Sequence, residues 1–369
     1  MLAGLAVFCA TATASPGPIE TEFDNTEILV ELPEPALTAP AAPDSPEQLA
    51  GLVRRQIDRA RSSGDPRFLG YAEGAFQQWQ GDMTGRLLVL RATLEQSLHR
   101  FDNARNDLDT VITGTGDPQQ KTQAILLLAN METVQGRYDA AETHCRQLQQ
   151  RYPGLIADSC LAQLRARTGS PRKAYQALKR QTSSAKADIT NRLWAEGTLG
   201  DIAAQLGMPE AAEHWRAVLS VSPDDLYTRA QLADWHLGQN QTDTTLSLTE
   251  GYEKVDSLAV LRAIAMVRSG HPNASIMVEN LRERFAEARW RGNLLHQRDM
   301  ARFYLDIEND TSTALEYARG NWRTQREPLD TRLLLRTALA TGDNQLAQEV
   351  RSWLDKHRQT DARYPEAES

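Results

Sequence analysis

The sequence predicts an all-α fold made of about nine consecutive helix pairs, and three observations support this prediction. A residue type suited to a tight turn recurs about every 35 residues. Small residues recur at fixed offsets on both sides of that turn. Apolar residues at helical spacing fill the stretches between turns. A non-repeating helical bundle would show the apolar spacing, but not a fixed register of small residues.

The chain of 369 residues opens with a short apolar run, from Leu2 to Phe8. Ala12 and Ala14 then stand at the two positions where a signal peptidase accepts small residues. Residues 1–14 are therefore predicted to be a signal peptide that is cleaved before Ser15, although no basic residue precedes the apolar run. The run is shorter than the roughly 20 residues that a membrane span needs. The alternatives are a lipid anchor at Cys9, which would need a small residue where Phe8 stands, and a chance apolar start.

Residues 15–49 carry eight of the 49 acidic residues, seven of the 16 prolines and no Lys or Arg. Proline lacks the backbone donor that helices and sheets need, and like charges repel. This stretch is therefore predicted to be an acidic, Pro-rich disordered tail. The remaining 41 acids balance the 41 Lys and Arg residues, so the body of the chain from residue 50 is formally neutral. That balance disfavours nucleic acid as a partner.

The turn positions set the register of the helical pairs. Glycine adopts a positive φ at no steric cost, and His and Asn tolerate it better than most residues do. This register predicts a solenoid over residues 50–361, followed by a C-terminal tail over residues 362–369. The predicted turn residues are Gly64, His99, Gly136, Gly169, Gly207, Asn240, Gly270, Asn309 and Gly342.

Small side chains at two offsets from the turn allow two antiparallel helices to approach closely, with a large residue beside each small one. Seven residues before the turn, the chain has Ala92, Ala129, Ala162, Gly200, Ala233 and Ala263. Five residues after it, the chain has Ala104, Ala141, Ala174, Ala212, Thr245, Ser275, Ala314 and Ala347.

This pattern resembles the tetratricopeptide repeat (TPR) family. The third unit matches the family best, with Ala129, Gly136, Tyr138, Ala141 and Pro153. The resemblance implies a right-handed superhelical solenoid in which the first helix of each pair lines a concave groove. It also implies a non-enzymatic protein that binds a peptide or a segment of another protein in that groove.

The repeat register projects a set of side chains into the groove. Some TPR domains hold a chain-terminal carboxylate with paired Lys, Asn and Arg residues, but this sequence offers only Asn130, with Leu126 where the Lys would stand. A groove of mixed polar and aromatic residues suits an internal segment of a protein instead. The groove candidates are Gln96, Gln123, Asn130, Trp194, Asp201, Tyr227, Asp234, His296 and Asp299, accompanied by Arg86, Val89, Thr93, Leu126 and Phe303.

No catalytic, nucleotide-binding or zinc-binding motif occurs in the sequence, and the seven histidines are dispersed. We therefore predict no cofactor, no metal and no enzymatic activity. Two aromatic–basic pairs, Trp290–Arg291 and Trp322–Arg323, could clamp a glycan or a base. The more ordinary use of such a Trp is to pack between helices while the Arg covers its edge.

Cys145 and Cys160 are the two cysteines that remain after leader removal. Cys145 stands nine residues after one turn residue and Cys160 nine residues before the next, so consecutive helices of the resembled family would bring them together. We predict a disulfide if the protein is exported. Two buried thiols are the alternative.

The sequence thus predicts a scaffold that binds a protein or peptide segment in the bacterial periplasm, or as a secreted protein. One alternative is a helical domain in an enzyme system that handles cell-envelope glycan. The other is a cytoplasmic TPR adaptor.

Overall fold

A computed structural model of the chain describes residues 43–184, 187–291 and 295–366. The predicted signal peptide and residues 15–42 of the predicted tail lie outside these ranges. Residues 42–369 form one unit, which is described here by itself.

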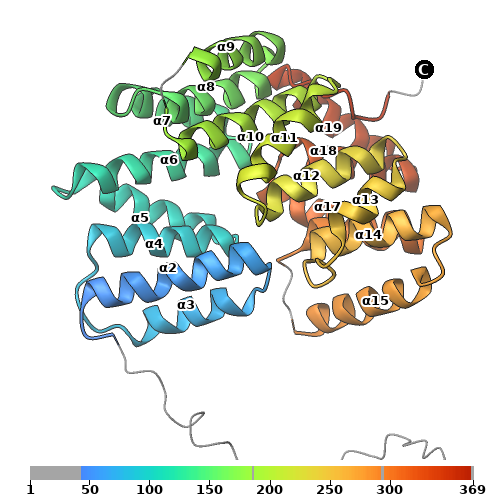
Figure 1. Cartoon of the computed structure of the whole chain (residues 1–369), viewed down its shortest axis with the longest axis horizontal. Coiled ribbons are helices and arrows are strands. Elements are labelled where there is room, and N and C mark those ends of the chain that lie inside the picture. The colour runs from blue at the N-terminus through green and yellow to red at the C-terminus, as the bar shows by residue number, and fades with distance from the viewer. Residues whose placement is uncertain (1–42, 185–186, 292–294, 367–369) are drawn as a thin grey trace, which may run out of the picture. The chain divides into compact units, whose positions relative to one another are not determined.

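The described residues form eighteen α-helices in nine consecutive pairs, with no strand among them (Figure 1). We call the first helix of each pair A and the second B. The A helices are α2 (Pro46–Ser63), α4 (Gly85–Ser97), α6 (Pro118–Val134), α8 (Leu155–Arg167), α10 (Ile189–Gln205), α12 (Leu226–Gly238), α14 (Asp256–Ser269), α16 (Gln297–Phe303) and α18 (Pro328–Thr341). The short π-helix η1 (Tyr304–Glu308) continues α16.

The B helices complete the pairs. They are α3 (Arg67–Gln78), α5 (Phe101–Thr113), α7 (Tyr138–Arg151), α9 (Pro171–Ser184), α11 (Glu210–Val221), α13 (Thr242–Thr249), α15 (Ala274–Trp290), α17 (Thr311–Thr324) and α19 (Asn344–His357). This arrangement confirms the prediction of an all-α solenoid of about nine helix pairs.

All nine predicted turn residues have a positive φ, between 56° and 94°. The three that are not glycine, His99, Asn240 and Asn309, lie at 56–58°, within the left-handed region that Asn and His tolerate. Each turn therefore separates the two helices of a pair where the register placed it. The predicted turn positions are confirmed at every pair.

Burial of the small residues shows why the register contains them. Those before the turns are all buried, and those after the turns are buried apart from Ser275. At Gly200 a Cβ atom would lie 2.5 Å from Nε1 of Trp215, which is fully buried. The indole on α11 thus occupies the space that the missing side chain leaves on α10. Unit seven departs from the pattern because α15 turns Met277 inward in place of Ser275.

The A helices form a continuous row, in which each one from α2 to α16 packs against the A helix of the next pair as well as its own B helix. The row turns back on itself, so that turns of the early pairs meet segments near the chain end. The amide of Arg326 donates to the carbonyl of Val134 over 2.6 Å, and the amide of Ala362 donates to the carbonyl of Gln205 over 2.9 Å.

The predicted boundaries differ from the structure at both ends of the solenoid. Helix α2 begins at Pro46, inside the predicted tail of residues 15–49, because Ser45 caps it and Leu49 is buried in the core. The predicted C-terminal tail of residues 362–369 also begins inside the packed region. Ala362 pairs with α10, and the hydroxyl of Tyr364 accepts a hydrogen bond from Gln359 over 2.9 Å.

Candidate functional site

One hollow crosses the first three A helices, and we call it the N-terminal groove. It has a volume of about 790 Å³. Apolar side chains form part of its wall, and Thr93, Gln120 and Gln123 add polar groups. Its lining residues include Glu47, Arg54, Ile57, Asp58 and Arg61 on α2, Arg86, Val89, Leu90 and Thr93 on α4, and Asp117, Gln120, Gln123, Leu126 and Leu127 at or on α6.

A second hollow, the central cavity, lies where α12, α14, α16 and α18 converge. Its volume is about 270 Å³. Leu261 and Leu333 contribute to an apolar wall, while Asp234, Arg302 and Arg332 stand at its charged side. The central cavity is therefore smaller than the N-terminal groove and lined by charges that bind one another.

These charges form an ion-pair ladder of five residues. Asp234 accepts hydrogen bonds from Arg302 and, over 2.6 Å, from Arg332. Asp306 in turn binds Arg302 at 3.2 Å and Arg336. Burial alone would raise the pKa of Asp234, but Arg302 and Arg332 outweigh it and hold the pKa well below its ordinary value. Asp234 is thus ionised whenever the fold is intact near neutral pH.

Asp201 and Tyr227 meet between α10 and α12. The Tyr227 hydroxyl donates to Asp201 over 3.0 Å, and the indole Nε1 of Trp215 donates to the other carboxylate oxygen over 3.2 Å. Burial raises the pKa of Asp201 to about 6, although Arg167 and these two donors act in the opposite direction. Tyr227 also lines the central cavity, so its side chain connects the buried Asp201 carboxylate with that cavity.

The groove candidates from the sequence fall into separate groups. Tyr227, Asp234 and Asp299 line the central cavity, where Asp201 contacts Tyr227. Gln123 lines the N-terminal groove. The other candidates line neither hollow: Gln96, Asn130, Trp194 and His296.

His296 lies at the start of α16, with Nδ1 3.7 Å from a carboxylate oxygen of Asp299. Burial lowers the pKa of His296, but the nearby Asp299 carboxylate outweighs this effect and raises it above its ordinary value. Asp299 lines the central cavity, so His296 lies next to a lining residue without lining the cavity itself.

The two aromatic–basic pairs differ in burial. Trp290 is 84% exposed at the end of α15. Trp322 instead packs edge-on against Trp353, donates from Nε1 to Thr331 over 3.1 Å and has the guanidinium of Arg326 4.2 Å from its ring. Packing between helices therefore accounts for Trp322.

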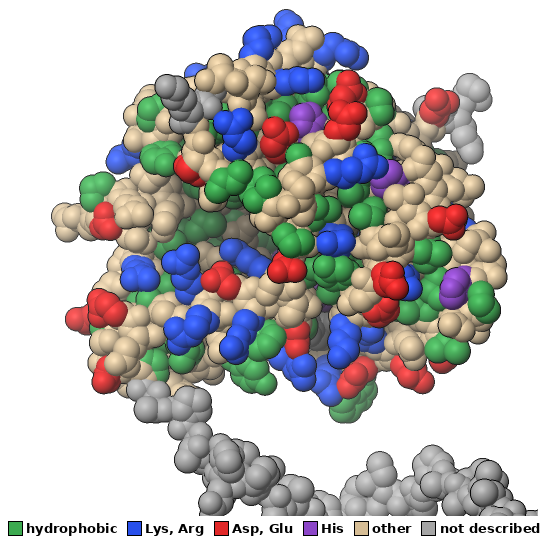
Figure 2. Space-filling view, in the orientation of Figure 1, with side chains coloured by type: hydrophobic (Ala, Val, Ile, Leu, Met, Phe, Trp, Pro, Cys, Tyr) green, Lys and Arg blue, Asp and Glu red, His purple; other side chains and the backbone are tan. Residues whose placement is uncertain are grey.

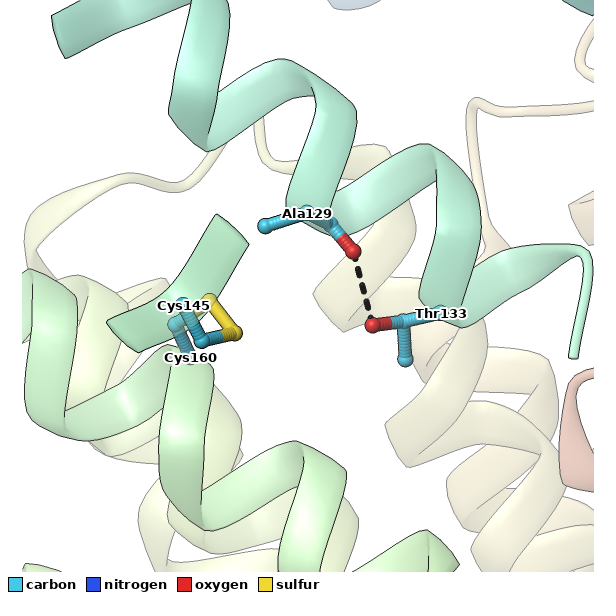
Figure 3. The surroundings of a disulfide bond; sticks show 4 residues. All are labelled: Ala129, Thr133, Cys145 and Cys160. Atoms are coloured by element: carbon cyan, nitrogen blue, oxygen red, sulfur yellow. Dashed lines mark hydrogen bonds between the residues drawn. A yellow bond between two sulfur atoms is a disulfide. The ribbon is translucent and has the colours of Figure 1, made fainter. Parts of the chain in front are cut away.

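Cys145 on α7 and Cys160 on α8 are joined by a disulfide, with an S–S distance of 1.98 Å and a Cα–Cα distance of 5.6 Å (Figure 3). The bond crosses from the B helix of the third pair to the A helix of the fourth. Both cysteines are buried. On the neighbouring helix α6, the Thr133 hydroxyl donates to the carbonyl of Ala129 over 2.8 Å.

Sequence reasoning did not find the arginines of the ladder or Gln120. Arg302 and Asp306 stand four residues apart, as do Arg332 and Arg336, which places each pair on one helix face. That spacing in the last two pairs is the signal from which the sequence could have predicted the ladder residues.

No group of three or more His, Cys, Asp or Glu residues in the described part of the chain converges as metal ligands. No described helix is long and apolar enough to cross a bilayer.

No protein-family model matches the chain, and no curated protein sequence matches it. Among solved structures, it is similar to the TPR domain of P58(IPK). The alignment covers 82% of this chain and 90% of that one, at 15% identity and a TM-score of 0.22. So low a TM-score adds nothing to the fold assignment, which rests on the helix pairs and their positive-φ turns.

Proposed function

We propose that this chain is a non-enzymatic scaffold that binds a segment of another protein in the N-terminal groove. The observation that carries this proposal is the groove itself, about 790 Å³ in volume and lined by both apolar and polar side chains of three A helices. Two interaxial steps of 8–10 Å make it roughly 20 Å across. An extended peptide of about six residues spans that distance.

The central cavity suits a structural role better. Its volume of about 270 Å³ lies below that of most ligand pockets, which begin near 300 Å³. Its charged groups are already engaged with one another, since Asp234 accepts from two arginines. A ligand that displaced them would leave buried charges without partners, which is costly.

The disulfide supports a periplasmic or secreted location for this scaffold, because such bonds persist in oxidising compartments and are rare in cytosol. The small residues Ala12 and Ala14 ahead of Ser15 support the same proposal from the sequence. Sequencing the N-terminus of the protein from its native cell tests it. A start at Ser15 agrees with export, whereas an intact Met1 in the cytosolic fraction favours the cytoplasmic adaptor.

Site-specific photo-crosslinking in the native cell tests the binding function. A photoreactive amino acid is placed at Gln123, inside the groove, and in a matched variant at Glu142, which is exposed on the B helix α7. We expect a discrete crosslinked partner from position 123 and none from position 142. Equal adducts at both positions, or none at position 123, would contradict groove binding. Hydrolysis of purified cell-wall glycan by the isolated chain would favour the enzymatic alternative.

A further inference from the structure

Three arginines and three acids line the N-terminal groove, and two of the arginines have no acid within ion-pair distance among the described residues. Arg54 faces Asp58 at 3.8 Å, and both side chains are more than 60% exposed, so this pair is weak but balanced. Arg61 and Arg86 also line the groove, and neither has an ion-pair partner among the described residues.

Apart from Asp58, which faces Arg54, the acids of the groove lie at helix N-termini. Asp117 caps α6, where its carboxylate accepts a hydrogen bond from the amide of Gln119 over 2.8 Å. Glu47 lies in the first turn of α2. A carboxylate at a helix N-terminus faces the positive end of the helix dipole, which offsets its charge. The charge left for a ligand to meet is therefore that of the two unpaired guanidinium groups.

The groove also offers apolar surface and an unused acceptor. Val89 is buried, and Leu90, Leu126 and Leu127 are half-buried along the wall. Oε1 of Gln120 is buried, yet it has no hydrogen-bond partner among the described residues. A buried acceptor without a donor is costly. If the Gln120 side chain turns toward the groove, the amide N–H of an extended peptide would satisfy this oxygen.

We propose that the N-terminal groove selects an extended peptide segment in which acidic residues alternate with apolar ones. This inference rests on the proposed binding function and adds the chemistry of the partner. Side chains of an extended strand alternate between its two faces, so one face would meet the leucines while the other presents carboxylates to Arg61 and Arg86. Figure 2 shows basic side chains over α2 and α4, with acidic ones among them, beside a hollow in this face of the molecule; the basic residues of these two helices are all arginines.

The test uses the full chain and two labelled octapeptides, one alternating Glu with Leu and one alternating Lys with Leu, followed by fluorescence anisotropy. We expect the acidic peptide to bind at least about tenfold more tightly at low ionic strength, with the difference shrinking as salt screens the charges. The double variant Arg61→Glu, Arg86→Glu should reverse the preference. Arg55→Glu, an exposed change on the same helix but outside the groove, should leave it unchanged.

A second variant tests the role of the buried acceptor. Gln120→Leu removes the unpartnered oxygen, so we expect the thermal midpoint to hold or rise while affinity for the acidic peptide falls about fivefold. If Gln120→Leu unfolds the chain, the melting curve will show it. The double variant Arg61→Glu, Arg86→Glu then still tests whether the groove prefers the acidic peptide.

The outcomes separate the two proposals. Equal affinity for both peptides, or binding of neither, overturns the acidic selectivity. Crosslinking at position 123 reports independently on whether any partner occupies the groove, so that result decides the proposed function.

Discussion

The hydroxyl of Tyr138 donates a hydrogen bond to Oε1 of Gln359 over 2.8 Å, although 221 residues separate the two in the chain. Both residues are buried, and the Tyr138 ring also contacts the rings of Trp353 and His357. Burial raises the pKa of Tyr138 to about 12, so the phenol stays a donor at neutral pH. This contact ties the third helix pair to the segment that follows the last helix.

Tyr138→Phe tests that tie. The change leaves a buried acceptor on Gln359 without its donor, so we expect the free energy of unfolding to fall by about 1–2 kcal/mol. Hydrogen exchange should show the loss of protection concentrated in residues 353–364. Tyr71→Phe is the control, because Tyr71 is exposed and should change stability by less than about 0.5 kcal/mol. Equal losses in the two variants would contradict the assignment.

Gly200→Ala tests the small-residue register. A Cβ atom at this position would lie 2.5 Å from Nε1 of the buried Trp215, so the indole must shift. We expect a loss of about 1–3 kcal/mol in urea unfolding. Gly197→Ala on the same helix is the matched control, because its added Cβ meets nothing within 4 Å. That variant should be neutral or gain about 0.5–1 kcal/mol from lower unfolded-chain entropy.

The repeat register could be predicted because its physics is local. A positive φ at Gly136 or Asn309 depends on the residue type at that position, and a small residue such as Gly200 leaves room whatever its partner is. Both features therefore appear in the sequence at fixed spacing. The helix pairs follow directly from them.

The return of the chain onto itself could not be predicted in the same way. Arg332 binds Asp234 across 98 residues, and Ala362 binds Gln205 through backbone groups that any residue carries. No spacing rule links such positions. For this reason the sequence predicted one continuous groove, whereas the structure has the N-terminal groove and a separate central cavity, with Asp234 engaged in ion pairs.

Asp234→Asn tests the ladder. The substitution removes the whole negative charge of Asp234, so Arg332 loses its acidic partner and Arg302 keeps only Asp306. Breaking a buried pair in this way costs about 3–5 kcal/mol. Asp65→Asn breaks the contact with the largely exposed Arg67 and should cost less than about 1 kcal/mol. Urea unfolding of both variants at neutral pH gives the comparison. A loss at Asp234 no larger than that at Asp65 would show that the ladder does not stabilise the fold.

Asp201 should make stability depend on pH between about 4 and 6. Its pKa in the folded chain is about 6, against an ordinary value of 3.8, because burial disfavours the carboxylate. Its contribution to stability is therefore complete below about pH 4 and is lost as the pH rises through about 6. Asp201→Asn removes this titration while keeping an acceptor for Trp215. We expect the variant to gain stability relative to the natural chain across this window, and parallel pH profiles would contradict the prediction.

The disulfide between Cys145 and Cys160 provides the last prediction. The two cysteines are 15 residues apart, and closing a loop of this size stabilises by about 3 kcal/mol in the chain-entropy model. Reduction of the natural chain should therefore lower its urea midpoint, while the double variant Cys145→Ala, Cys160→Ala should be insensitive to reductant. Mass spectrometry of unreduced peptides from the natively located protein should recover the linked pair. Alkylatable thiols at both positions after denaturation would show that the bond does not form in the cell, and would remove one support for export.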